Sequence, residues 1–298
     1  NELWRFFSTW KGDRERDAKW EYSNLGYGML AEALALRAGR SYEALLQERV
    51  LQPLGLQSMS LAFRGKSVAG LLRGHDPQGR PVSNWRFDAM AGAGALVGSA
   101  RALARYAQAA VGAFDHPLAE AFRLTMRRRA EGPNPVTPLG LAWFIELLDG
   151  RQLFMHNGGT GGFSTSIVID LQRRRATLVL ANAQGAVNDL ALHALDPRLP
   201  VRNVAAEKQN AQRAGQALTA EELVPLPASY ALNPQFKVVI RLKDGKLLAQ
   251  ATGQGEFELF ALDARKFFAR VTPLEMHFEG DSGVPPAFVL HQAGQKLR

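Results

Sequence analysis

The sequence predicts an α+β domain followed by a small all-β unit, and three observations carry this prediction. Apolar residues at helical spacing, with capping residues beside them, dominate roughly the first 130 residues. Strand-like segments separated by turn signals follow between residues 140 and 181. From about residue 219 the chain contains only short strand-like segments, which is typical of a sandwich or a barrel.

Helices in the first domain are indicated by apolar spacing and by their start and stop residues. Asn24–Ala38 is apolar at helical spacing and ends at Gly39, a residue type favoured directly after a helix. Ser41 and Ser99 are N-cap candidates for two further helices. We expect helices at 2–11, 24–38, 42–50, 100–111, 119–129 and 187–195, and irregular chain at 57–88.

A meander of antiparallel strands is expected in the middle of the chain. Asp149-Gly150 is a two-residue hairpin signal between two apolar runs. The glycine-rich stretch after Met155 is interpreted as a turn. The expected strands are 140–148, 152–155, 164–170 and 176–181. Strands flanked by helices in this way favour an α+β domain with an antiparallel sheet.

The last third of the chain is expected to be a separate domain. Residues 1–198 form the first domain, 199–218 a polar linker that is partly helical, and 219–298 a small all-β barrel-like domain. Asp244-Gly245 is a hairpin signal between two of its strands. The expected strands are 237–242, 246–252, 256–262, 266–271, 274–278 and 287–291, and the expected interior residues are Val238, Ile240, Leu242, Phe257, Leu259, Phe267 and Phe288.

Composition excludes several kinds of chemistry. The chain has 298 residues and no cysteine, so disulfides, thiolate metal sites and cysteine nucleophiles are excluded. The six histidines form no H-x-x-x-H pair, and no metal or other cofactor is expected. The formal net charge of +8 lies in residues 1–218. Because the two Arg triplets, 127–129 and 173–175, are short and no nucleic-acid motif accompanies them, we interpret them as solvated ends and turns.

Two motifs are candidates for chemistry. Trp20-Glu21-Tyr22-Ser23-Asn24 stands where a helix begins, and His156-Asn157-Gly158-Gly159-Thr160 follows a strand. Taken separately, each has a plain structural interpretation. Tyr22 is then a packed aromatic residue, Asn24 a helix cap, and the glycines a hairpin turn.

Together, in this order, the two motifs resemble the serine β-lactamase and penicillin-binding superfamily, in its class C and D-Ala-D-Ala carboxypeptidase branch. That family has three motifs, S-x-x-K, Y-x-N and K-T-G or H-x-G. Tyr22-Ser23-Asn24 matches the second and His156-Asn157-Gly158 the third. The resemblance covers about residues 1–198, with further familial stretches at 24–28, 50–56 and 93–100. Residues 219–298 are similar to a lipocalin-like domain appended to such hydrolases. The stretches 244–247 and 252–254 carry this similarity.

The first motif of the family has a single match, Ser8-Thr9-Trp10-Lys11. With 12 Ser and 9 Lys, chance alone gives about 0.4 such matches. Ser8 lies in an expected helix and only 14 residues before Tyr22, whereas the family separates these motifs by several dozen residues. We therefore interpret Ser8 and Lys11 as a chance match. The resemblance then implies an N-terminally truncated chain that lacks the nucleophilic serine and its lysine, with Asn1 inside the original domain.

The resemblance also implies roles for the remaining residues. Tyr22 would relay a proton to the leaving group, Asn24 would donate to the substrate amide carbonyl, and Gly159 would supply one oxyanion N–H. His156 replaces the lysine of K-T-G, so its charge depends on pH. The remaining residues of the third motif are assigned to substrate binding: Asn157, Gly158 and Thr160. Asn157 stands where the family usually has a threonine.

The function implied is that of a serine acyl hydrolase on D-Ala-D-Ala-type peptides or β-lactams, in the periplasm. An esterase or D-aminopeptidase of the same fold remains an alternative, as does a fragment that only binds peptide or glycan. The partners expected are small-molecule or peptide substrates. Neither a nucleic acid nor a transmembrane segment is expected, since no apolar run approaches the roughly 18 residues of a membrane span.

Overall fold

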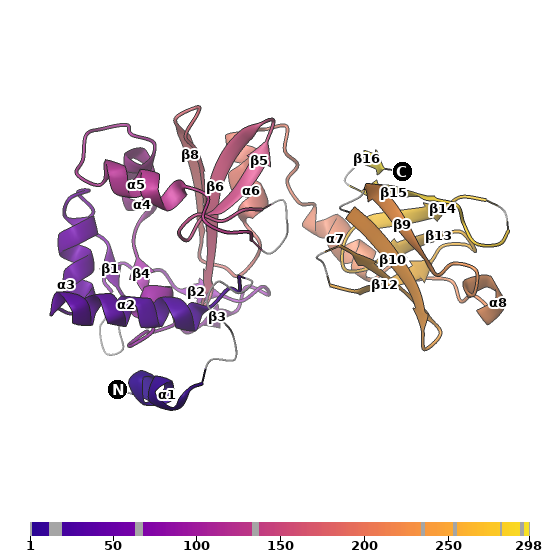
Figure 1. Ribbon diagram of the computed structural model, residues 1–298, viewed down its shortest axis with the longest axis horizontal. Coiled ribbons are helices and arrows are strands. Elements are labelled where there is room, and N and C mark those ends of the chain that lie inside the picture. The colour runs from indigo at the N-terminus through magenta and orange to yellow at the C-terminus, as the bar shows by residue number, and fades with distance from the viewer. Residues whose placement is uncertain are drawn as a thin grey trace. The chain divides into compact units, whose positions relative to one another are not determined.

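Figure 1 shows the computed structural model of the chain, which describes residues 2–11, 20–62, 68–132, 137–233, 236–252, 255–280, 282–292 and 295–297. The chain divides into two compact units, Asn1–Leu199 and Pro200–Arg298. Helices and antiparallel strands occur together in the first unit, so the predicted α+β class is confirmed. None of the described helices is long and apolar enough to cross a membrane.

The helices of the first unit begin close to the predicted positions. The side chains of Ser41 and Ser99 cap α3 and α4, and Gly39 ends α2 with a left-handed φ of 65°. A π-helical turn, Gln47–Leu51, continues α3. A 3-10 turn, η2, covers Ala91–Ala93. The helices are α1 Glu2–Thr9, α2 Asn24–Ala38, α3 Tyr42–Leu46, α4 Ala100–Ala110, α5 Ala119–Met126 and α6 Asn188–Leu195.

A four-stranded antiparallel sheet with the order β5-β6-β7-β8 forms the centre of this unit. Asp149 and Gly150 both have positive φ, 50° and 73°, as a two-residue hairpin of the predicted type requires. The strands are β5 Phe144–Leu148, β6 Arg151–Thr160, β7 Phe163–Asp170 and β8 Arg175–Ala181. Two-residue strands form in the region expected to be irregular, 57–88: β2 Gly74–His75 pairs with β3 Pro81–Val82, and β1 Ser60–Leu61 pairs with β4 Leu96–Val97, which lies beyond that region.

Two predictions for the sheet are wrong. The strand expected at 140–148 begins only at Phe144, because the chain bends at Leu141 and Ala142, where Ala142 has a positive φ of 63°. The second error concerns β6. The expected strand ended at Met155 before a glycine turn, but β6 continues through the glycines to Thr160, and only Gly161 and Gly162 turn. Continuous pairing with β7, from Leu153 opposite Asp170 to Thr160 opposite Phe163, overrides the low strand propensity of glycine.

Helices cover both faces of this sheet, and side chains alternate between the two faces. Figure 1 shows α6 on one side of the strands and α4 and α5 on the other. On the α6 side, Leu153 and Val168 pack against Ala191 and Leu195. On the other side, the buried cluster combines sheet residues with residues of the helices and of the loops beside them: Ile145, Phe154, Ile169, Leu51, Leu54, Ala109, Phe122 and Trp143.

A buried ion pair joins the strands at the hairpin end of the sheet. Asp170 is 0% exposed and pairs with Arg151, whose side chain is 11% exposed. The second Asp170 oxygen accepts from the Arg173 backbone N–H at 3.0 Å. Arg151 Nη2 lies 3.8 Å from a carboxylate oxygen of Asp196, so this one guanidinium links β6, β7 and the end of α6.

The second unit is an eight-stranded antiparallel meander in sequence order, β9 to β16. Asp244 and Gly245 have positive φ in the predicted hairpin. The Tyr230 ring lies 5.0 Å from Phe288 and 5.9 Å from Phe278, so the sheet curls to bring its first strand towards β14 and β15. The strands are β9 Ala228–Asn233, β10 Phe236–Lys243, β11 Lys246–Ala251, β12 Phe257–Ala261, β13 Lys266–Ala269, β14 Leu274–Phe278, β15 Phe288–Gln292 and β16 Gln295–Leu297.

The inner face of this sheet holds the predicted core. Five of the seven predicted residues are buried, and Leu242 and Phe257 pack against them half-buried. Two short helices, α7 Val204–Ala211 and α8 Ala220–Leu223, precede the strands. Of residues 199–218, expected to form a linker, all but Leu199 belong to the second unit, where Arg270 donates to the Arg213 carbonyl oxygen at 2.9 Å. Gly253 and Gln254 lie outside the described residues.

Candidate active site

The third motif lies on an open edge of β6. β5 pairs with β6 only as far as Phe144 opposite Met155, whereas β6 continues to Thr160. In an antiparallel sheet alternate residues bond to opposite neighbours. Met155 bonds towards β5, so the backbone groups of Asn157 and Gly159 point to the same side, where β5 has ended. Among the described residues no strand pairs with this short edge, so the Gly159 N–H is available to an extended chain or to an oxyanion, whereas the Asn157 carbonyl oxygen already accepts from His156 Nδ1.

The glycines at 158, 159, 161 and 162 have different structural surroundings. A Cβ on Gly162 would lie 2.5 Å from the Gly74 backbone, and one on Gly161 would lie 2.4 Å from the Ser83 carbonyl oxygen. A Cβ on Gly158 would meet only Thr165 Oγ1, at 2.8 Å, and one on Gly159 would meet nothing within 4 Å. Close packing therefore explains Gly161 and Gly162, whereas Gly159 stands in open space at the free edge.

The second motif lies at the start of α2. Ser23 is the N-cap of this helix, with φ −145°, and its Oγ accepts from the Gly26 backbone N–H at 2.9 Å. The interpretation of Asn24 as the helix cap is therefore wrong by one residue. Asn24 is exposed, and its amide makes no hydrogen bond within the part of the chain that the structure describes.

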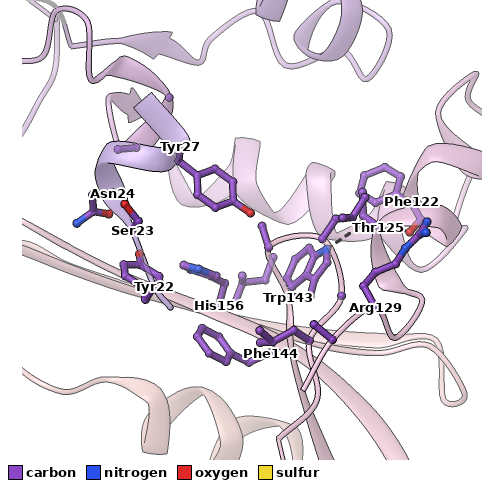
Figure 2. A pocket seen from close by; sticks show the side chains of 18 of the residues that line it. Tyr22, Ser23, Asn24, Tyr27, Phe122, Thr125, Arg129, Trp143, Phe144 and His156 are labelled. Carbon is purple, nitrogen blue, oxygen red and sulfur yellow. Dashed lines mark hydrogen bonds between the residues drawn. The ribbon is translucent and has the colours of Figure 1, made fainter. Parts of the chain in front are cut away.

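A cavity of about 800 Å³ brings the two motifs together. Tyr22, Ser23 and Asn24 line it from the α2 side and His156 from the sheet, and most of its wall is apolar. Figure 2 shows Tyr27 reaching from α2 towards the side of the cavity that carries His156 and Trp143. The rest of the wall includes Trp20, Val50, Leu103, Tyr106, Leu118, Phe122, Thr125, Arg129, Leu139, Phe144 and Ile167.

The His156 ring has a defined hydrogen bond. Its Nδ1 lies 2.6 Å from the Asn157 carbonyl oxygen, and because a carbonyl oxygen only accepts, Nδ1 donates in this bond. A neutral His156 therefore keeps the lone pair of Nε2 free to accept a hydrogen bond. The Phe144 ring packs beside the imidazole, with 5.7 Å between the ring centroids.

Two tyrosine side chains that line the cavity have raised pKa values. Burial, and to a smaller extent the nearby Tyr22, raises the pKa of Tyr27, so Tyr27 is a neutral phenol that can donate a hydrogen bond. Burial raises the pKa of Tyr106 to about 12. Trp143 Nε1 donates to Thr125 Oγ1 at 3.3 Å, which fixes the indole in the wall (Figure 2). Within the described ranges no group of three or more His, Asp or Glu side chains is arranged to hold a metal ion.

The structure brings together some of the predicted site residues and not others. Tyr22, Asn24 and His156 share the cavity, whereas the other predicted positions, Asn157, Gly158, Gly159 and Thr160, continue along β6 beyond its wall. Ser8 and Lys11 are both exposed and do not line the cavity, and Ser8 Oγ donates to the Arg5 carbonyl oxygen at 2.8 Å.

Several residues of the cavity were not found from the sequence. Tyr27 lies one helical turn after Ser23, a spacing that places it beside the motif, but the sequence analysis assigns it no role in the site. Trp143 lies within the strand expected at 140–148 but precedes β5, of which Phe144 is the first residue. Arg129 reaches the cavity wall because α5 ends at Met126, three residues earlier than predicted.

Comparisons with known proteins agree with this geometry. A family model described as Beta-lactamase matches residues 1–198. The D-alanyl-D-alanine-carboxypeptidase/endopeptidase AmpH of Escherichia coli (strain K12) is 24% identical over 214 residues, covering 63% of this chain and 54% of AmpH. Penicillin-binding protein 4* of Bacillus subtilis (strain 168) is 21% identical, covering 95% of this chain and 66% of that protein.

Solved structures share the fold. The octameric penicillin-binding protein homologue from Pyrococcus abyssi has a TM-score of 0.59 at 17% identity, covering 93% of this chain and 66% of that chain. A class C β-lactamase from Rhodobacter sphaeroides has a TM-score of 0.54 at 19% identity, covering 62% of this chain and 60% of that chain. The chain spans about half the length of AmpH, the curated relative described above.

Proposed function

Because the chain belongs to the β-lactamase family, we propose that its first unit carries the substrate-binding and proton-transfer residues of a serine acyl hydrolase. In this reaction a serine hydroxyl attacks a carbonyl carbon, the leaving group departs with a proton, and water releases the acyl group from the enzyme. The proposed substrates are D-Ala-D-Ala-type peptides or β-lactams. The observation that carries the proposal is the cavity shared by Tyr22, Asn24 and His156.

Tyr22 is proposed to pass the serine proton to the leaving group. Its ring is 53% exposed, and its hydroxyl makes no hydrogen bond to any described residue, so it is accessible to a substrate. His156 lies on the opposite wall with Nε2 as an acceptor, so it can receive the phenolic hydrogen bond or, when protonated, stabilise a phenolate.

Asn24 and Gly159 are proposed to bind the substrate carbonyl and the oxyanion. The Asn24 amide is free for this because Ser23 caps the helix. The Gly159 N–H is supported as an oxyanion donor by its place on the open edge of β6, and preorganised donors of this kind contribute a factor of about 10²–10³ to kcat. Asn157, Gly158 and Thr160 are proposed to line the path of the substrate backbone along the same strand.

The nucleophilic serine and its lysine are proposed to come from residues outside these 298. Ser8, in the single S-x-x-K match, lies exposed on α1 away from the cavity. The open apolar stripe on α2 supports the proposal further. Tyr27, Leu30 and Leu34 are 43–50% exposed at helical spacing, and an apolar stripe of this kind normally faces a core.

An esterase or D-aminopeptidase of the same fold is the second candidate. It is favoured by Asn157, which stands where the family has a threonine whose hydroxyl helps to bind a substrate carboxylate. A non-catalytic fragment that binds peptide is the third. The proposed location is the periplasm, by family resemblance. The second unit, which contains none of the motif residues, is proposed to support the first unit without taking part in chemistry.

Labelling with a fluorescent penicillin tests the proposal. A longer protein that supplies S-x-x-K ahead of residue 1 is expected to form a covalent adduct on that serine, and hydrolysis of D-Ala-D-Ala peptides against simple esters separates the first two candidates. A stable, folded longer protein that forms no adduct and hydrolyses neither substrate class would leave peptide binding as its function.

A further inference from the structure

Three ring contacts join the two motifs of the candidate site. The Trp20 ring packs edge-to-face on Tyr22, with 6.4 Å between centroids and an interplanar angle of 70°. It packs in the same way on Phe144, at 6.1 Å and 85°. Phe144 in turn lies 5.7 Å from the His156 ring. A continuous series of rings therefore runs from the Tyr22 phenol to the His156 imidazole.

Tyr22 has few other restraints. Its ring is 53% exposed, and within the described residues its hydroxyl has no hydrogen bond. The next residue, Ser23, uses its side chain on Gly26. The buried residues of α2 pack mainly against η2 and α3, so the helix does not itself fix Tyr22 against the sheet. Among the described residues, the Trp20 ring connects the Tyr22 side chain to β5 through Phe144.

We propose that Trp20 is a positioning residue, which with Phe144 sets the distance and orientation of the Tyr22 phenol relative to His156. Edge-to-face packing suits this role because it prefers a narrow range of angles, whereas aliphatic packing does not. The inference rests on the proposed function, since it assigns Trp20 its importance through the proton transfer of Tyr22. Misplacement of a reacting group by about 1 Å costs on the order of 10²-fold in rate.

The first test uses the 298-residue chain alone and needs no activity. The variants are Trp20→Ala, Trp20→Phe and the control Trp10→Ala, in which the lost indole is exposed whereas that of Trp20 is half-buried, but likewise packs edge-to-face on a phenylalanine, Phe7. Ring signals of Tyr22 and His156 are followed by NMR with labelled tyrosine and histidine. Trp20→Ala is expected to move both sets of signals and Trp20→Phe to move them less. The control is expected to leave them in place, with helix content unchanged in all three by circular dichroism.

The second test uses a longer, penicillin-reactive protein. Trp20→Ala is expected to lower the acylation rate by roughly 10²-fold while KM stays within about threefold, with most of the rate restored by Trp20→Phe and none lost in Trp10→Ala. Unmoved Tyr22 signals in Trp20→Ala, or a loss of rate that Trp20→Phe does not rescue, would overturn the proposal. Absence of acylation in the parent protein would count against the proposed function alone, because the NMR signals still decide the role of Trp20.

Discussion

Neutralising Asp170 is the sharpest test of what holds the first unit together. In Asp170→Asn the shape is kept, but Arg151, with a side chain 11% exposed, loses its charged partner. Its other carboxylate neighbour, Asp196, remains 3.8 Å from Nη2. Removing one partner of a buried pair costs about 3–5 kcal/mol, because the other charge stays buried. With a slope of about 2 kcal/mol per molar urea for a unit of this size, the unfolding midpoint should fall by roughly 1.5–2.5 M.

Tryptophan fluorescence reports this transition selectively. All five tryptophans precede residue 144, so their emission follows the first unit and not the second. The matched control is Asp149→Asn, which removes the same charge from a side chain 53% exposed and paired with exposed Arg198. It is expected to leave the midpoint unchanged within error, since exposed pairs contribute little. A midpoint for Asp170→Asn equal to that of Asp149→Asn would refute the reasoning.

Three further predictions follow from the same structure. Ser23→Ala should destabilise the first unit by about 1 kcal/mol through loss of the α2 cap, whereas Asn24→Ala should not; equal losses in urea unfolding would return the cap role to Asn24. Hydrogen bonds from the side chain and backbone of Arg198 hold the pKa of Asp196 well below its usual range. The contribution of the ionised Asp196 to stability is therefore present above about pH 4 and is lost as the pH falls further. In Asp196→Asn the urea unfolding midpoint should therefore fall less steeply below about pH 4 than in the wild type. In a penicillin-reactive longer protein, Tyr22→Phe should lower acylation by about 10²–10⁴-fold, and a rate within threefold of wild type in stopped-flow assays would make Tyr22 a packing residue.

Elements whose ends are set locally could be predicted from the sequence. Helix α2 begins and ends where predicted, because Ser23 and Gly39 each decide the backbone within one turn of the helix. The hairpins at Asp149-Gly150 and Asp244-Gly245 follow for the same reason, since two adjacent positive φ angles are a requirement of the turn itself.

Elements whose ends depend on tertiary pairing could not be predicted from the sequence. The extension of β6 through Gly158 and Gly159 depends on β7 lying beside it, which no local pattern reveals. In the second unit, residues 200–218 are polar and were expected to form a linker. Two of their polar side chains contact β13, because Asn210 donates to the Ala269 carbonyl oxygen at 2.6 Å and Arg213 lies over the Phe268 ring at 4.5 Å, and no local pattern reveals such contacts.

The candidate site could be predicted only in part, because only some of its residues belong to motifs that the local sequence reveals. Tyr22 and His156 belong to motifs with local signatures, and the fold places both on one cavity. Tyr27 and Trp143 also line the cavity, but neither is assigned a role from the sequence, because aromatic residues with apolar neighbours are normally part of a core. The offset of the cap from Asn24 to Ser23 could not be read either, since serine and asparagine cap helices about equally well.

We propose above that the nucleophile of the acyl-transfer site is not among the 298 residues of this chain. Intact mass after incubation with a penicillin tests it most directly, on the chain alone and on Ser8→Ala. The account predicts the mass of the unmodified chain in both samples, because Ser8 is exposed on α1 and away from the cavity. A covalent adduct on the chain that disappears in Ser8→Ala would contradict the account and make Ser8 the nucleophile.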